Sequence, residues 1–180
     1  MVFVMFADGF EEVESMTIVD YLRRGGVDAK MVSNTDSLTV TGAHGVKMQA
    51  EIKFSEADFD NCEMIVLPGG LPGAEYLRDN DELIEQIKKF VEGGKRVAAI
   101  CAAPIGLARA GVLEGRKATC YPGIEGQLGD CKYTAKKDVV TDGPVTTSRG
   151  PATAIWFALE LVELLKGKAA SEEVRKGLLA

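Results

Sequence analysis

Residues 2–33 read VFVMFADGFEEVESMTIVDYLRRGGVDAKMVS, and this stretch decides the fold. Val2–Ala7 is an apolar run of the length of a buried strand, and an Asp-Gly turn follows it. Phe10–Arg24 has its apolar residues at helical spacing and ends at two glycines, after which Val27–Ser33 predicts another strand. A strand, a helix and a strand in this order predict a right-handed βαβ unit with parallel strands.

The rest of the chain continues this alternation. Residues 38–54 alternate apolar and polar side chains around a glycine-containing turn and predict an inserted β-hairpin. Ser171 is placed to cap the last helix. The other predicted strands are Met64–Leu67, Arg96–Cys101, Lys117–Cys120, Asp138–Thr141 and Val145–Ser148, and the other predicted helices are Leu83–Val91, Pro104–Ala110, Ala152–Leu165 and Ser171–Leu179. The pattern predicts an α/β fold with a mostly parallel sheet covered by helices on both faces, in one domain over residues 1–180.

Composition narrows the class of protein. A chain of 180 residues that is 46% hydrophobic can bury one sizeable core. Lys and Arg total 21 against 27 Asp and Glu, a net charge of −6, so nucleic acid and anionic membranes are not expected partners. No apolar run approaches the ~18 residues of a membrane span, and no secretory signal is visible, so we expect a soluble cytoplasmic protein. The four cysteines have no Cys-x-x-Cys spacing and are expected to be reduced thiols.

Cys101 is the first candidate for chemistry. It closes a predicted strand and is followed by Ala102 and Ala103 before Pro104 opens a helix. Small neighbours on both sides are what a nucleophile at a sharp strand-to-helix turn requires. Backbone N–H groups and the positive end of the helix would favour the thiolate and lower the pKa of Cys101. The alternative is a small core cysteine that ends a buried strand.

Glu14 is the second candidate. Phe10, Ile18 and Leu22 lie at four-residue steps from it, so Glu14 is the only ionisable group in an otherwise apolar row. Burial would raise the pKa of this carboxyl and make it a proton donor or general base near neutrality. The alternative is that Glu14, like Glu11 and Glu12, only interacts favourably with the helix dipole.

Other residue patterns carry weaker signals. Gly69 and Gly70 follow a strand end, where backbone N–H groups can bind an oxyanion, although such glycines are more often simple turn formers. No dinucleotide or P-loop motif is present, and no cofactor is expected. The only histidine, His44, falls in the predicted hairpin turn, far from Cys101 in sequence, and is expected to be exposed. The cysteines, with His44, match no zinc spacing, so no metal site is expected.

Four blocks in order give the chain a family resemblance. They are Asp8–Glu14, Val66–Gly70, Ala98–Pro104 and Thr147–Thr153. Together they resemble the ThiJ/PfpI superfamily, of the class I glutamine amidotransferase-like type, in the branch of the Parkinsonism-associated deglycase. The resemblance implies a flavodoxin-like three-layer sandwich and a homodimer. It also implies that Cys101 is the nucleophile, that Glu14 donates a hydrogen bond to it, and that the N–H groups of Gly70 and Ala102 form an anion pocket.

Two positions depart from the pattern of relatives. Protease-like and chaperone-like branches have a histidine directly after the nucleophile, where this chain has Ala102, so a peptidase would lack its base. The Parkinsonism-associated branch has a histidine where this chain has Tyr121, and a phenol is a weak base at neutral pH. Glu14 would then carry most of the proton transfer, with Tyr121 and Arg149 as candidate auxiliary residues.

These observations favour a glutathione-independent glyoxalase, of glyoxalase III or deglycase type, acting on small reactive carbonyl compounds such as methylglyoxal or on their adducts. Cys101 would add to the aldehyde and Glu14 would move the proton. The alternative is an oxidative-stress sensor or redox-regulated chaperone that works through a Cys101 sulfinate. A weaker alternative is a cysteine hydrolase or peptidase.

Overall fold

Seven strands form the central sheet of the computed structural model, which describes residues 1–180. These strands are β1 (Val2–Phe6), β2 (Ala29–Ser33), β5 (Ile52–Lys53), β6 (Met64–Leu67), β7 (Arg96–Ile100), β10 (Val139–Asp142) and β11 (Val145–Ser148). Their order is β10-β11-β7-β6-β1-β2-β5, and every neighbouring pair is parallel except the antiparallel pair of β10 and β11. The predicted mostly parallel sheet is therefore confirmed.

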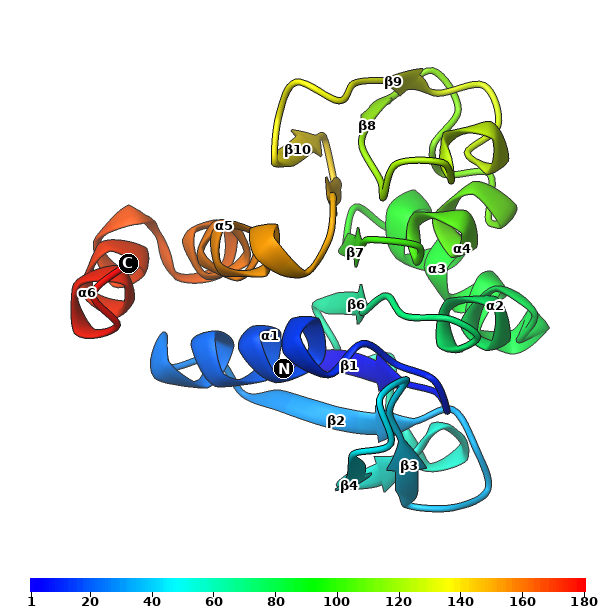
Figure 1. Cartoon of the computed structure of the whole chain (residues 1–180), viewed down its shortest axis with the longest axis horizontal. Helices are drawn as coiled ribbons and strands as arrows, with labels where there is room; N and C mark the ends of the chain where they lie inside the picture. Colours follow the sequence, from blue (N-terminus) through cyan, green and yellow to red (C-terminus); the bar gives the residue numbers. More distant parts are fainter.

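Helices cover both faces of this sheet (Figure 1). One face carries α1 (Glu12–Arg24), α5 (Ala154–Lys166) and α6 (Lys168–Gly177), with α5 packed between the other two. The opposite face carries α2 (Gly73–Arg78), α3 (Asp81–Glu92) and α4 (Pro104–Arg109), which also contact one another. The arrangement is the three-layer α/β sandwich that the sequence predicts. None of these helices is long and apolar enough to cross a bilayer.

The segment predicted as an inserted hairpin has two parts. β3 (Thr39–Thr41) and β4 (Lys47–Gln49) form an antiparallel pair outside the main sheet, as predicted. The following strand, β5, instead joins the edge of the main sheet beside β2. A second small sheet, not predicted as such, pairs β8 (Lys117–Ala118) with β9 (Lys132–Tyr133) in parallel.

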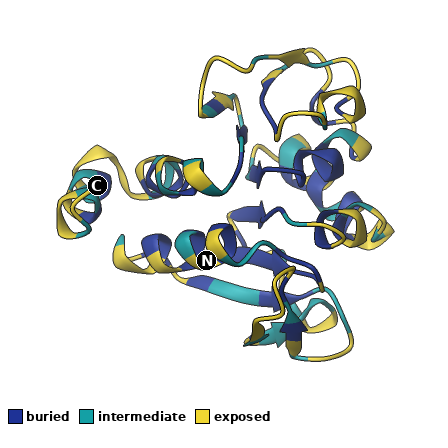
Figure 2. Ribbon diagram, viewed as in Figure 1, coloured by how far each residue is buried: buried dark blue, intermediate teal, exposed yellow.

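The core lies on both sides of the central strands (Figure 2). Every residue of β1, β6 and β11 is buried, as expected for parallel strands with helices on both faces. In β11 the buried residues include three with hydroxyl groups, and each hydroxyl has a partner. Thr146 faces Thr141 at 3.1 Å, Thr147 accepts from the Thr119 N–H at 2.9 Å, and Ser148 donates to the Asp138 carbonyl at 2.7 Å. A polar strand can therefore lie in the core beside β7.

The last helix differs from its prediction. It begins at Lys168, so Ser171 lies inside α6 and does not cap it. The Ser171 hydroxyl donates instead to the Leu159 carbonyl of α5 at 2.9 Å, and the residue is 7% exposed. A serine near the start of a helix can cap that helix or donate a hydrogen bond to a neighbouring element. Here α6 packs on α5, and the Ser171 hydroxyl bonds to α5.

Candidate active site

Cys101 lies at the predicted turn between β7 and α4. Its φ of 64° falls in the left-handed region, which is costly for a residue with a side chain. Two hydrogen bonds hold this backbone: the Cys101 N–H donates to the Ser148 carbonyl at 3.0 Å, and the Cys101 carbonyl accepts from the Tyr121 N–H at 2.9 Å. The turn is therefore held between the end of β11 and the segment that follows β8.

Glu14 projects from the first turns of α1 toward this cysteine and is fully buried. Its Oε2 accepts the Gly69 N–H at 2.8 Å, while the buried Oε1 has no partner of standard hydrogen-bond geometry. The Cys101 side chain is the group that interacts with the same carboxyl. Burial raises the pKa of Glu14 to about 7, the negative charge of Glu11 adds to the rise, and the Gly69 and Cys101 hydrogen bonds offset part of it. Glu14 can therefore both hold and release a proton near neutrality.

Gly69 lies between the two candidate residues. A Cβ atom at this position would lie 2.5 Å from the Cβ of Cys101 and 2.6 Å from Oε2 of Glu14, so only glycine fits. Because its N–H is bonded to Glu14, Gly69 is not the anion-binding donor that the sequence predicts. The N–H groups of Gly70 and Ala102 do interact with the Cys101 sulfur, as the resemblance implies. They are the donors that could stabilise negative charge at this position.

The loop before α1 and the loop after β6 are in direct backbone contact. Gly70, with a φ of 90°, leaves no room for a Cβ against the Glu11 N–H and the Gly9 carbonyl. A Cβ on Gly9 would lie 2.5 Å from Pro72, and one on Gly73 would lie 2.8 Å from the Gly9 carbonyl carbon. The Glu11 N–H also donates to the Gly69 carbonyl at 2.9 Å. The contact fixes the start of α1, and with it Glu14, against the glycine loop.

The acidity of Cys101 differs from the sequence prediction. Burial raises the pKa of Cys101 to about 12, with the charge and hydrogen bond of Glu14 adding to the rise and the Gly70 and Ala102 N–H groups opposing it. The predicted lowering is therefore wrong for this state, because Cys101 is only 9% exposed and faces a carboxyl group. When Glu14 holds a proton, its charge no longer opposes a thiolate. The protonation of Glu14 and that of Cys101 therefore influence each other.

The two candidate auxiliary residues lie at different places. Tyr121 is 48% exposed, and a Cβ on Gly150 would lie 3.2 Å from its ring, so the ring covers the backbone after β11. Arg149 directly follows β11, and its buried Nε has no hydrogen-bond partner. The positive charge of Arg149 lowers the pKa of Cys120 and Tyr133, against larger opposing effects, and is not among the groups that shift Cys101. Tyr121 is therefore the auxiliary candidate connected directly to the nucleophile.

His44 is an exposed residue of the hairpin turn, as predicted. Its Nδ1 lies 2.8 Å from Oε2 of Glu12, and its backbone N–H donates to Oε1 of the same residue at 2.7 Å. The histidine is therefore engaged at the start of α1 and forms no dyad with Cys101 within the chain.

Sequence reasoning missed two features of the site. One is the Ser148 carbonyl that accepts the Cys101 N–H, and the other is the hydrogen bond from the Gly69 N–H to Glu14. Ser148 pairs with Ile100 in the parallel register of β11 and β7, which brings its carbonyl to the Cys101 N–H. No local sequence pattern predicts the register between β11 and β7. Gly69 was recognised as part of a glycine turn, but its bond to Glu14 depends on the contact between two loops. All four cysteines are free, as predicted.

Comparisons with known proteins agree with this architecture. A family model described as the DJ-1/PfpI family matches residues 1–164. Protein DJ-1 homolog B of Arabidopsis thaliana is 40% identical over 96% of this chain, which spans only 40% of that relative's length. A deglycase of Pyrococcus abyssi is 36% identical over 92% of this chain and 99% of its own. The crystal structure of Drosophila melanogaster DJ-1beta superposes with a TM-score of 0.96 at 37% identity, covering 99% of this chain and 97% of that one.

Proposed function

Because this chain belongs to the DJ-1/PfpI family, we propose that it is a cysteine-dependent enzyme of glyoxalase III or deglycase type that acts on methylglyoxal-like dicarbonyls. The observation that carries the proposal is the buried pair of Cys101 and Glu14, with the pKa of Glu14 raised to about 7. The deglycase name of the Pyrococcus abyssi relative supports an enzymatic role.

The first step is addition of Cys101 to the aldehyde. The sulfur forms a bond to the aldehyde carbon, the thiol proton passes to the Glu14 carboxylate, and the aldehyde oxygen becomes an alkoxide that takes that proton. The product is a hemithioacetal. The N–H groups of Gly70 and Ala102, which interact with the sulfur, are placed to stabilise negative charge as the oxyanion develops.

The second step moves a proton between neighbouring carbons. The Glu14 carboxylate removes the proton from the former aldehyde carbon, giving an enediolate, and returns it to the adjacent carbon. The hydroxyl proton of the first carbon moves to the oxygen of the second, so a thioester of a 2-hydroxy acid remains on Cys101. Water then cleaves the C–S bond and releases lactate with the free thiol. The net reaction is methylglyoxal plus water giving lactic acid, with no external oxidant or reductant.

The test is consumption of methylglyoxal without glutathione, with lactate measured as the product. The wild-type chain should form many lactate molecules per protein, Cys101→Ser should form none, and Glu14→Gln should be slower by at least ~10²-fold, the scale of a general acid–base contribution. Cys131→Ser is the matched control, because Cys131 is a more exposed thiol outside the site and should not change the rate. Undiminished lactate formation by Cys101→Ser would refute the proposal.

Deglycation is the other half of the proposal and needs its own experiment. Adducts of methylglyoxal with thiols dissociate reversibly, so removal of free dicarbonyl imitates repair of the adduct. The release of lactate from a preformed adduct should therefore be compared with and without an excess amine that traps free methylglyoxal. Lactate formation that survives trapping supports direct deglycation, and formation that stops assigns free methylglyoxal as the substrate.

A second candidate function is a redox sensor or chaperone controlled by a Cys101 sulfinate. The observation that favours it is the buried, unpartnered Oε1 of Glu14, which in its protonated form could donate to a sulfinate oxygen. Peroxide titration followed by mass spectrometry tests it. Cys101 should oxidise faster than Cys131, although Cys131 is more exposed, and the oxidised protein should protect a client from aggregation. No observation favours a peptidase, because Ala102 follows the nucleophile and His44 binds Glu12.

We also propose that the chain forms a homodimer and acts in a reducing compartment such as the cytoplasm. Exposed apolar side chains on α1 and α5 support a second copy as the partner: Val13, Met16 and Trp156 are 55%, 40% and 46% exposed. Four free thiols suit a reducing environment. Sedimentation of the wild-type chain and of Met16→Lys tests the dimer. The variant should have a larger dissociation constant, so it should be monomeric at protein concentrations at which the wild-type chain is still a dimer.

A further inference from the structure

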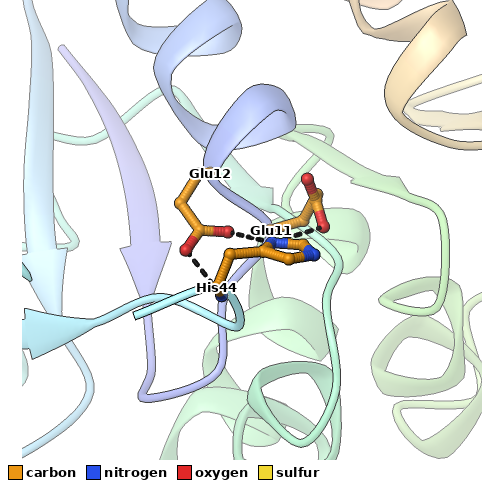
Figure 3. Close-up of side chains that lie close together, drawn as sticks. All are labelled: Glu11, Glu12 and His44. Atoms are coloured by element: carbon orange, nitrogen blue, oxygen red, sulfur yellow. Dashed lines mark hydrogen bonds and ion pairs between the residues drawn. The ribbon is translucent and has the colours of Figure 1, made fainter. Parts of the chain in front are cut away.

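A second cluster of chemically active groups lies outside the Cys101 site, where the hairpin turn meets the start of α1 (Figure 3). Nδ1 of His44 lies 2.8 Å from Oε2 of Glu12 and 3.8 Å from Oε2 of Glu11. One ligand atom from each of the three residues can be chosen so that all lie within 4.8 Å of one another. One imidazole nitrogen and two carboxylate oxygens thus converge on one point.

His44 interacts unequally with the two carboxylates. Both oxygens of Glu12 have partners in His44, whereas the Glu11 carboxylate accepts no hydrogen bond and only faces the imidazole at 3.8 Å. Both glutamate side chains are only 14% exposed. Two like charges brought together with little water repel each other, and a positive charge between them, either the protonated His44 ring or a bound cation, relieves this repulsion.

We propose that Glu11, Glu12 and His44 bind a divalent transition-metal cation of the zinc type. A nitrogen and two carboxylate oxygens are ligands that zinc accepts, and the Irving–Williams order favours the late first-row ions at such a site. His44 is 70% exposed, so the remaining coordination positions are open to water. The sequence predicts no metal site, because its three ligands come from two segments joined only by the fold.

Hydrogen bonds from backbone N–H groups already hold these two segments together. The Ala43 N–H donates to the Phe10 carbonyl at 2.8 Å, the Gly9 N–H to the Thr41 carbonyl at 2.7 Å, and the Thr41 N–H to the Asp8 carboxylate at 2.8 Å. A cation would therefore bind ligands that are largely in place, with little ordering cost. It would also connect the hairpin to the first turn of α1 more tightly.

The test uses Zn²⁺ and the full-length chain. His44 is the only histidine, so its ring resonances report on this site alone. We expect one Zn²⁺ per chain by calorimetry, with the His44 ring signals shifting to saturation at the same ratio. Glu11→Gln and His44→Asn should each weaken that binding at least ~10-fold, the lower end of what loss of a supporting group costs a metal site. The matched control is Glu85→Gln, which removes an exposed carboxylate paired only with Lys88 and should leave binding unchanged.

Glu11→Gln is the deciding variant, because the Glu11 side chain makes no hydrogen bond whose loss could unfold the turn. Unchanged thermal unfolding of the metal-free variant would show that its fold is intact. Zn²⁺ binding that leaves the His44 signals in place, which is what coordination by the cysteines would give, would overturn the proposal. Binding by Glu11→Gln with wild-type affinity would also overturn it, because a simple pair of His44 and Glu12 would then suffice.

Discussion

Replacing Glu14 by Gln should make the folded protein more stable at pH 8 but hardly at pH 5. In the folded chain the pKa of Glu14 is about 7, against 4.5 for a solvated glutamate, because burial disfavours the charged form. Below pH 4.5 both states of the chain bind this proton and the group costs nothing. As the pH rises toward 7 the unfolded chain loses the proton first, so folding stability falls. At 1.36 kcal/mol per pKa unit, the cost reaches about 3 kcal/mol at pH 8 and stays below about 1 kcal/mol at pH 5.

The amide of the variant has the shape of the carboxyl and can still accept the Gly69 N–H, so it removes the charge without leaving a cavity. Urea unfolding of the wild-type chain and of Glu14→Gln at both pH values measures the effect. Glu85→Gln, an exposed glutamate, should show no such pH dependence and serves as the control. A stability difference that is equal at pH 5 and pH 8, or a variant that is less stable at pH 8, would refute the reasoning.

Three further predictions concern single residues. Gly69→Ala should lose activity and about 1–3 kcal/mol of unfolding free energy in urea, because its methyl group overlaps Cys101 and Glu14, whereas Gly126→Ala, where a Cβ meets nothing, should be neutral. Cys101→Gly should be more stable than Cys101→Ala by about 1 kcal/mol in the same assay, because glycine alone adopts a φ of 64° without strain; equal stabilities would contradict a strained turn. Ser171→Ala should lower the free energy of unfolding by about 1 kcal/mol, measured by thermal or urea unfolding, because the hydrogen bond to Leu159 is lost. An unchanged stability would show that this hydrogen bond does not stabilise the packing of α6 on α5.

Local patterns were sufficient to predict most of the main sheet and both helical layers. Strands such as Met64–Leu67 are buried on both faces, so they appear in the sequence as apolar runs. The parts that were not predicted depend on partners far away in the chain. β5 has only two residues and joins the sheet by pairing with β2. β9 pairs with β8, from which a long connecting segment separates it in the chain. Short strands of this kind carry too few residues for a periodic signal.

The candidate site shows the same division. The turn at Cys101 and the unusual position of Glu14 in an apolar row are local features, and the structure brings the two residues together. The acidity of Cys101 was predicted with the wrong sign, since the helix start was visible in the sequence but the burial of the thiol against a carboxyl was not. The cluster at His44 was missed for the same reason, because its ligands meet only when the hairpin packs on α1.

The contact of the two glycine-bearing loops limits how this chain can evolve. Gly9 and Gly73 carry no chemistry and Gly70 contributes only its backbone N–H, yet at each of the three a side chain would push the loops apart. The arrangement of Cys101 and Glu14 therefore also depends on these three glycines, which must be kept as a set. Tyr121, which is half exposed, lies outside this contact of the two loops. A substitution at Tyr121 can therefore change the surroundings of Cys101 while the two loops, and with them the pair of acid and thiol, stay in place.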